Sequence, residues 1–261
     1  MEPSSATVAA YSPCGSTAAV CRAVAEGTGL AWDERDLARG TRPEPVDPGT
    51  LVVLGAPVAG GAVPALGLER LGRVHTAFSP CVLVCAYGDR DPGHGLHDLE
   101  AIAPDLGLVP VAAVLAPVRH VMVPALGAGR PTADDLAAYR SFGAAVASAL
   151  RDAGGLFDLA PPPLPPASCP RERLELGFTA ECDPAACVGC GACAGACPAG
   201  CIPADEPYLT DTARCDGCMA CIGVCPVRAR SLSDPARLAA VRERCTAGWE
   251  GPHRPRLVMG A

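Results

Sequence analysis

The sequence contains one cysteine motif twice, and this repeat constrains the fold more than any other feature. Residues 187–198 read CVGCGACAGACP, and residues 215–226 read CDGCMACIGVCP. In each copy the four cysteines are separated by two, two and three residues, and a proline follows the last one. A segment with so many thiols and so little apolar mass does not bury enough surface to offset its chain entropy. We therefore expect residues 177–230 to fold around a metal.

The spacing of the cysteines indicates which metal. Structural zinc is held by pairs of cysteines separated by a long loop, and this motif lacks such a loop. The pattern is instead one by which bacterial proteins hold [4Fe–4S] clusters, with the fourth cysteine of each motif bound to the other cluster. The predicted ligands of the first cluster are Cys187, Cys190, Cys193 and Cys225. The predicted ligands of the second cluster are Cys215, Cys218, Cys221 and Cys197.

Eight of the sixteen cysteines lie outside the two motifs, and we expect them to be packing residues. They are Cys14, Cys21, Cys81, Cys85, Cys169, Cys182, Cys201 and Cys245. A second interpretation of Cys14 is a reactive thiol, because a position beside a helix N-terminus lowers the pKa of cysteine.

Composition and charge narrow the class of protein. The 261 residues carry a net charge of −7, which argues against nucleic acid as a partner because phosphate binding needs a basic surface. The N-terminus has no basic region followed by an apolar core, and the longest apolar run, 108–118, is too short to cross a bilayer. These features predict a cytoplasmic protein without membrane insertion. All basic residues are arginine, which excludes a phosphate-binding lysine and a lysine Schiff base.

Before the cysteine motifs, the sequence alternates between apolar strands and amphipathic helices. The runs LVVLGAPV at 51–58 and CVLVCAY at 81–87 are continuously apolar, as strands buried on both faces of a parallel sheet are. Thr132 and Asp135 form the start signal of a helix that continues to about Asp152. The pattern predicts a doubly wound, five-stranded parallel sheet in the order 2-1-3-4-5. The expected strands are 7–11, 31–37, 51–58, 81–87 and 109–115.

A stretch rich in proline, FDLAPPPLPPASCP at 157–170, follows the α/β pattern. Such a segment forms neither helix nor sheet and behaves as an extended spacer. We therefore place a domain boundary here, and expect a short final helix at 234–245. The predicted parts are a doubly wound domain at 1–156, a linker at 157–176, a small α+β two-cluster domain at 177–232, and a helix and tail at 233–261.

The cysteine motifs resemble those of the two-cluster bacterial ferredoxins, and the resemblance extends toward the N-terminus. Four segments are similar to a family of flavodoxin–ferredoxin fusion proteins, which are predicted electron carriers. They are YSPCGSTAAVCRAVAEG, APVAGGAVPALGLERL, AYGDRDPGHGLHDLE and GAGRPTADDLAAYRSFG. The resemblance continues to CPVRARSLSDPA after the second motif, and so covers nearly the whole chain. It implies a flavodoxin-like domain followed by a ferredoxin-like domain.

The resemblance also raises the question of FMN. In flavodoxins the loop that corresponds to residues 12–17 holds the FMN phosphate, and two further loops surround the flavin ring. It implies as cofactor-binding residues Ser12, Cys14, Gly15, Ser16, Thr17, Ala59, Gly60, Tyr87 and Gly88. However, the chain has Ala59 and Pro92 where the family usually has aromatic residues that cover the ring. Two interpretations therefore remain: the domain binds FMN, or it is kept as a scaffold or docking surface.

Three functions remain after this reading of the sequence. The first is an electron-transfer protein with two [4Fe–4S] clusters that exchanges electrons with redox partner proteins. The second is a small flavin-dependent reductase fed by its own ferredoxin domain, although no acid–base pair stands in the predicted flavin loops. The third is an iron–sulfur sensor or assembly partner. We expect the first, and no catalytic residue is predicted.

Overall fold

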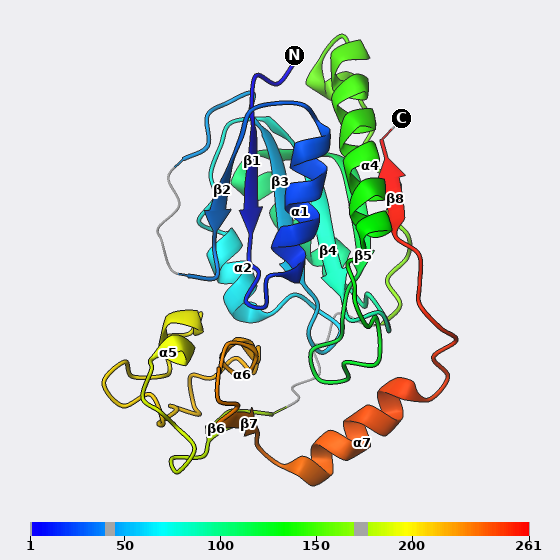
Figure 1. Ribbon diagram of the computed structural model, residues 1–261. Helices are drawn as coiled ribbons and strands as arrows, with labels where there is room; N and C mark the ends of the chain where they lie inside the picture. Colours follow the sequence, from blue (N-terminus) through cyan, green and yellow to red (C-terminus); the bar gives the residue numbers. More distant parts are fainter. Residues whose placement is uncertain (1, 40–44, 170–176, 261) are drawn as a thin grey trace.

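The computed structural model describes residues 2–39, 45–169 and 177–260. It places a large α/β layer structure above a smaller cysteine-rich segment, which lies beneath one end of the sheet (Figure 1). In the described residues, no helix has the length and apolar character needed to cross a membrane. Residues 170–176 of the predicted linker lie outside the described residues.

The main sheet has six strands in the order β2-β1-β3-β4-β5-β8. The first five are parallel to one another, which confirms the predicted doubly wound order 2-1-3-4-5, the order found in flavodoxin. Their bounds are β1 Ala6–Ala10, β2 Trp32–Asp36, β3 Leu51–Pro57, β4 Ser79–Tyr87 and β5 Leu108–Pro117. All nine residues of β4 and all but the last of β3 are buried, as their apolar runs predict.

The sixth strand, β8 (Arg256–Met259), was not predicted from the sequence. It comes from the end of the chain and pairs antiparallel with β5, Leu257 standing opposite Val114. Four residues are too few to show a clear alternation of apolar and polar side chains, so the sequence does not predict this strand. It pairs with β5 because β5 is the open edge of the parallel sheet. The C-terminal tail thus returns to the sheet of the N-terminal part.

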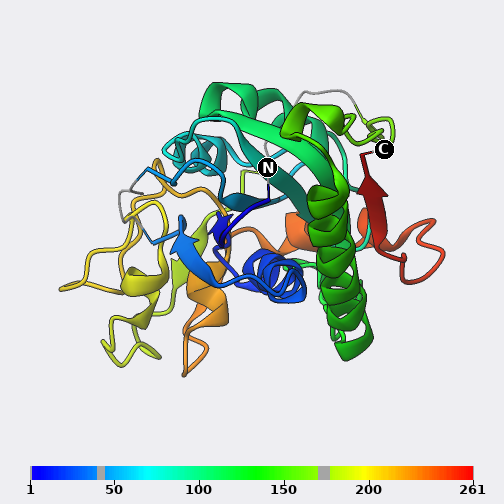
Figure 2. The same ribbon diagram turned by 90° about the horizontal axis from the view of Figure 1, so that it is seen from above.

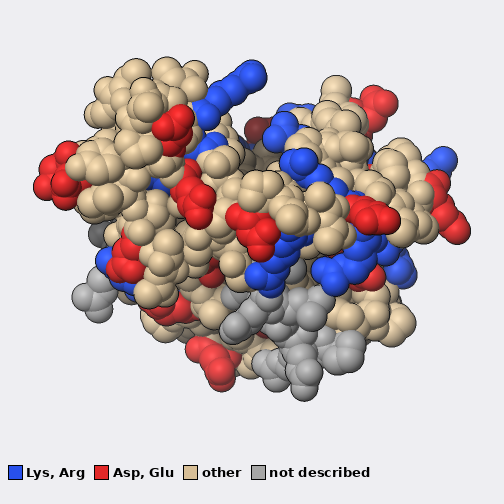
Figure 3. Space-filling view, turned by 90° about the horizontal axis from the view of Figure 1, so that it is seen from below, with Lys and Arg blue, Asp and Glu red and all other residues tan. Residues whose placement is uncertain are grey.

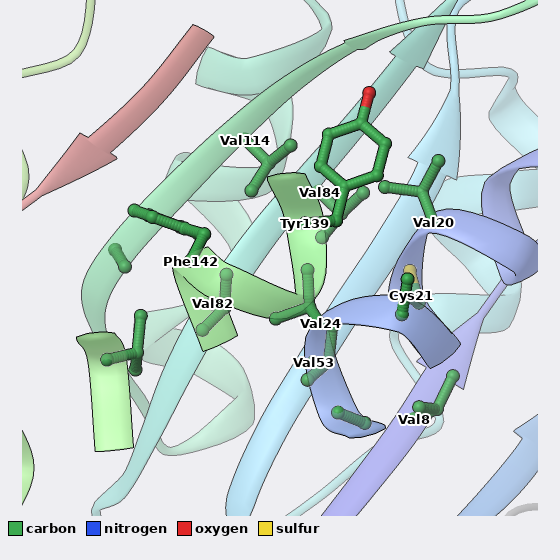
Figure 4. Close-up of a cluster of buried hydrophobic side chains, with 14 of the residues drawn as sticks. Val8, Val20, Cys21, Val24, Val53, Val82, Val84, Val114, Tyr139 and Phe142 are labelled. Atoms are coloured by element: carbon green, nitrogen blue, oxygen red, sulfur yellow. The ribbon is translucent and has the colours of Figure 1, made fainter. Parts of the chain in front are cut away.

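Helices cover both faces of the sheet, as a doubly wound fold requires (Figure 2). On one face α1 (Ser16–Gly27) and α4 (Ala133–Asp152) bury Val20, Tyr139 and Phe142 against the valines of the strands (Figure 4). The other face is covered by α2 (Ala65–Leu71) and α3 (Gly95–Ile102). The predicted capping box of α4 is confirmed: Thr132 and Asp135 each accept a hydrogen bond from the other's backbone N–H. Single turns of 3₁₀ helix occur at Pro104–Leu106 and Leu156–Asp158.

The cysteine-rich segment contains little regular structure. Its elements are the antiparallel pair β6 (Ala180–Cys182) and β7 (Arg230–Leu232), and the short helices α5 (Ala192–Ala196) and α6 (Ala220–Gly223). The helix α7 (Pro235–Thr246) then leads to β8 and agrees with the final helix expected from the sequence.

A third apolar core joins the two parts of the chain. Met122, Val123 and Leu126, from the loop after β5, pack with residues of the cysteine-rich segment and of α7. Those residues are Phe178, Met219 and Val241. The buried contacts therefore continue across the predicted linker.

Candidate metal centres

The first candidate centre is a cavity that collects cysteines from both motifs. It is lined by Cys187, Cys190 and Cys193 of the first motif and by Cys225, the last cysteine of the second. These are the four ligands predicted for the first cluster. Val188 and Val227 also line this cavity, and their side chains are 64% and 43% exposed, so its mouth faces solvent.

The second candidate centre has the complementary composition. Its lining includes Cys215, Cys218 and Cys221 of the second motif and Cys197, the last cysteine of the first. These are the ligands predicted for the second cluster. The chain thus brings together the two crossed sets that the spacing predicts. The two sets lie at neighbouring places, since α5 of the first motif packs against α6 of the second.

The local backbone repeats at the two centres. Helices α5 and α6 each begin after a residue of positive φ, Gly191 at 71° and Met219 at 64°. The N–H of Cys201 donates to the Cys197 sulfur at 3.4 Å, and the N–H of Ala229 donates to the Cys225 sulfur at 3.2 Å. Each donor follows the last cysteine of its motif by four residues. The repeated sequence therefore folds into two similar loops around two similar sites.

Backbone N–H groups also act on the thiols electrostatically. Desolvation alone would raise the pKa of Cys225, but N–H groups of Val227, Arg228, Ala229 and Arg230 point at the sulfur and hold the pKa below its usual value. In contrast, burial raises the pKa of Cys221 to about 11. N–H groups directed at sulfur are the means by which proteins stabilise the negative charge of iron–sulfur clusters.

The donor set fits [4Fe–4S] clusters better than single ions. In the described parts of the chain, no three or more His, Cys, Asp or Glu side chains are arranged to hold one metal ion. One zinc ion needs its sulfur ligands within about 2.3 Å of a single point. Here the cysteines surround cavities, four predicted thiolate ligands to each, which is the ligand number and chemistry of a [4Fe–4S] cluster.

Each cavity holds one more cysteine than the motif predicts. Cys182 lines the first cavity, and Cys201 lines the second. The Cys201 sulfur lies 3.3 Å from that of Cys197, and only 3% of Cys201 is exposed. Cys201 was expected to be a packing residue because no ligand spacing includes it. Its position four residues after Cys197 is the one sequence signal that points to the cavity.

A buried arginine fixes the loop beside the first cavity. Arg230 on β7 is 4% exposed, and its guanidinium donates hydrogen bonds to the carbonyl oxygens of Pro207 and Leu209 and to the hydroxyl of Thr210. Pro207 lines the first cavity, so these bonds hold the cavity wall in place. The sequence did not single out Arg230, because nothing in its neighbourhood distinguishes it from the exposed Arg228.

The residues of the predicted phosphate loop lie at the carboxyl end of β1, as expected, but the side chains of Ser12 and Cys14 already have partners in the chain. The Ser12 hydroxyl accepts the N–H of Ala18, and Thr17 is 1% exposed. Gly15 and Ser16 continue into α1. The Cys14 sulfur donates to the carbonyl of Cys218, in the second motif. Desolvation raises the pKa of the Cys14 thiol although the residue as a whole keeps solvent contact, which speaks against the second interpretation of Cys14 as a reactive thiol.

The predicted ring loops are engaged as well. Ala59 pairs with Ala62 in a tight turn around Gly60, and Gly88 lies directly against the His120 ring. The Tyr87 ring, 4% exposed, faces the ring of His253 at 6.3 Å between centroids. With a cysteine-motif loop on Cys14 and the C-terminal tail on Tyr87, these residues do not fit FMN in this arrangement of the chain.

Comparison with known proteins agrees with the metal chemistry. The family described as "4Fe-4S binding domain" matches residues 208–231, which include the whole second motif. No curated protein matches the chain. The α/β part has the strand order of flavodoxin, so the chain joins a flavodoxin-like fold to a 4Fe–4S binding segment.

Three solved structures illustrate the similarity of the α/β part. A flavodiiron core from Synechocystis sp. PCC6803 matches at 19% identity and a TM-score of 0.42, over 57% of this chain and 36% of its own. A flavodoxin from the domain Archaea matches at 13% identity and a TM-score of 0.39, over 56% of this chain and 99% of its own. The rubredoxin oxygen:oxidoreductase of Desulfovibrio gigas matches at 14% identity and a TM-score of 0.39, over 57% of this chain and 37% of its own. The chain spans about a third of the length of the flavodiiron core.

Proposed function

We propose that the protein is an electron-transfer protein that carries two [4Fe–4S] clusters. The observation that carries this proposal is the pair of cavities, each with three cysteines of one motif and the last cysteine of the other. Clusters of this kind, when bound, accept and release single electrons. All their ligands are cysteines, so no iron is left open for a substrate.

The chain's own residues hold the clusters and set their surroundings. The eight motif cysteines bind iron, and the N–H groups of Cys201 and Ala229 donate to the sulfurs of Cys197 and Cys225. The contact between α5 and α6 keeps the two sites adjacent, so an electron can pass from one to the other. The hydrogen bond from Arg230 to the carbonyl oxygen of Pro207 fixes this part of the wall of the first cavity.

The redox partner meets the protein at the first cavity. Its mouth is bordered by the exposed Val188 and Val227, with Cys190 exposed beside them. On the face seen from below, acidic and basic side chains are interspersed (Figure 3). We therefore assign recognition of the partner mainly to the apolar border of this cavity. A cytoplasmic location belongs to the same proposal, because reduced thiols persist there.

The reductase alternative requires FMN, and the loops that would hold it are engaged by other parts of this chain. FMN therefore has no role in the proposed function. A single preparation tests both statements: the protein is purified without oxygen and assayed for iron, flavin and electron paramagnetic resonance after reduction. We expect about eight irons per chain, no flavin, and the signals of two interacting clusters. About four irons per chain, or fewer, would contradict the proposal of two clusters.

A further inference from the structure

The crevice at the carboxyl end of the sheet has no role in the function proposed so far. In doubly wound folds ligands bind outside the carboxyl ends of the strands, where the strand order reverses, and here that point lies between β1 and β3. Tyr11 and Cys14 follow β1 at this end, and Arg70 on α2 lies near Tyr11. The question is what this crevice binds.

The contacts in the structure give the answer. Tyr11 is fully buried, and its hydroxyl donates to the carboxylate of Asp216 at 3.2 Å. The Cys14 sulfur donates to the carbonyl of Cys218 at 3.2 Å. Both acceptors belong to the loop of residues 215–219, which contains two predicted ligands of the second cluster. Arg70 donates to the carbonyl of Pro198, beside a third ligand, Cys197.

We propose that this crevice is the docking site of the chain's own second-cluster loop, residues 215–219, and that it takes this loop in place of a flavin. The inference rests on the proposed function, because it places the second cluster at the position where the fold offers a ligand site. The α/β domain thereby covers the second cluster and leaves the first as the route to the partner.

Apolar packing supports the docking beyond the hydrogen bonds. Met219, the last residue of the loop, is 8% exposed and packs with Met122 and Leu126 from the loop after β5. Removing the cysteine-rich segment would take Met219 and Phe178 away from Met122 and Leu126, and would leave the Tyr11 hydroxyl without the Asp216 carboxylate. Such a mixture of apolar and buried polar surface is typical of a surface made to be covered.

Charge and the tail act against a flavin. The Asp216 carboxylate lies at the Tyr11 hydroxyl, and its negative charge disfavours an anionic ligand such as FMN in this crevice. On the other side of the crevice, the Trp249 ring N–H donates to the Asp89 carbonyl at 2.8 Å. The backbone N–H of His253 donates to the buried Asp89 carboxylate at 2.9 Å. The tail therefore fixes the loop after β4 that would have to accept the ring.

The first experiment titrates the purified holoprotein with FMN and follows flavin fluorescence. The docked loop predicts that the fluorescence is unchanged when the protein is in tenfold excess. Stoichiometric quenching would overturn the proposal. Iron is assayed in the same sample, so a preparation without clusters counts against the proposed function, and a preparation with clusters that binds FMN counts against the docking alone.

The second experiment measures amide hydrogen exchange at residues 12–19 and 118–127 of the holoprotein. Asp216→Arg places a cation beside Tyr11 and Arg70, and we expect exchange in both segments to become about tenfold faster. The matched control is Asp205→Arg, an exposed carboxylate in the same segment, which should leave exchange unchanged. Unchanged exchange in Asp216→Arg would overturn the docking.

If Asp216→Arg loses iron, the variant Tyr11→Phe tests the docking in its place. It leaves the cysteine-rich segment intact and removes only the hydroxyl that Asp216 accepts from. We expect exchange at residues 12–19 to become several-fold faster, with the iron content unchanged. Exchange equal to that of the parent protein would again overturn the docking.

Discussion

The two candidate centres are built from the same motif, yet their surroundings differ. The first cavity opens between Val188 and Val227, both exposed. The second has the α/β part of the chain against its loop, through Tyr11 and Cys14. A repeated sequence therefore forms two similar cysteine-lined cavities, and the contacts with the rest of the chain cover the loop of the second while the first keeps exposed residues at its border.

The largest expected effect comes from removing the crossed ligand of the first centre. Cys225→Ala should lose the first cluster and about half of the iron, although Cys225 lies in the second motif. Electron paramagnetic resonance of the reduced protein should show a single remaining cluster. Cys245→Ala, which removes a cysteine outside both motifs, is the control and should keep all the iron. If Cys225→Ala instead abolishes the cluster of Cys215, Cys218 and Cys221, the crossed ligation is wrong.

The corresponding change in the second centre should have a smaller effect. Cys201 lies 3.3 Å from Cys197, sulfur to sulfur, whereas Ala229 occupies the equivalent position near Cys225. Cys197→Ala should therefore lose clearly less iron than Cys225→Ala, because Cys201 lies beside the ligand that is lost and is placed to supply a thiolate, whereas Cys182, the extra cysteine of the first cavity, lies beside Cys187. The double variant Cys197→Ala/Cys201→Ala should lose the second cluster. Equal iron loss in the two single variants would show that the extra cysteine has no such role.

The wall of the first centre gives a third test. Arg230→Met removes hydrogen bonds to the carbonyl oxygens of Pro207 and Leu209 and to Thr210. Hydrogen bonds from a charged group are worth about 1.5–3 kcal/mol each, so we expect the free energy of unfolding to fall by about 2 kcal/mol or more. Thermal unfolding of the holoprotein measures this change. The exposed Arg228→Met is the control, and an equal loss in both variants would contradict the role of Arg230.

The smallest expected effect tests whether solvent reaches the first centre more easily than the second. Ferricyanide should destroy the first cluster several-fold faster than the second, because exposed residues line the first cavity and only buried or half-buried ones line the second. The time course of the two signals in electron paramagnetic resonance measures the ratio. Asp216→Arg should bring the two rates closer by loosening the cover over the second cluster. Equal rates in the parent protein would mean that both centres are equally open.

Much of this molecule could be predicted from local sequence patterns. The buried strands of the sheet read as continuous apolar runs, and the Thr132–Asp135 box marks the start of α4. The cysteine spacing groups the eight motif cysteines into the two sets that line the two cavities, and their role as cluster ligands stays a prediction. Such features depend on neighbours within a few residues, and a single sequence displays them directly.

Other features depend on partners far along the chain. Strand β8 pairs with β5 more than 140 residues before it, and Tyr11 meets Asp216 across 205 positions. Arg230 and Cys201 look ordinary in the sequence, and only the folded chain brings one against Pro207 and the other against Cys197.

The sequence by itself determined the two building blocks of this protein, a doubly wound sheet and a twice-repeated cluster motif, because periodicity and ligand spacing are local properties. Only the tertiary structure decided how they meet. Whether the crevice beside residues 12–17 holds a flavin or a loop depends on what the rest of the chain places there. In this protein the loop of residues 215–219 is there, since Asp216 completes the hydrogen bond of a buried tyrosine and Met219 completes an apolar core.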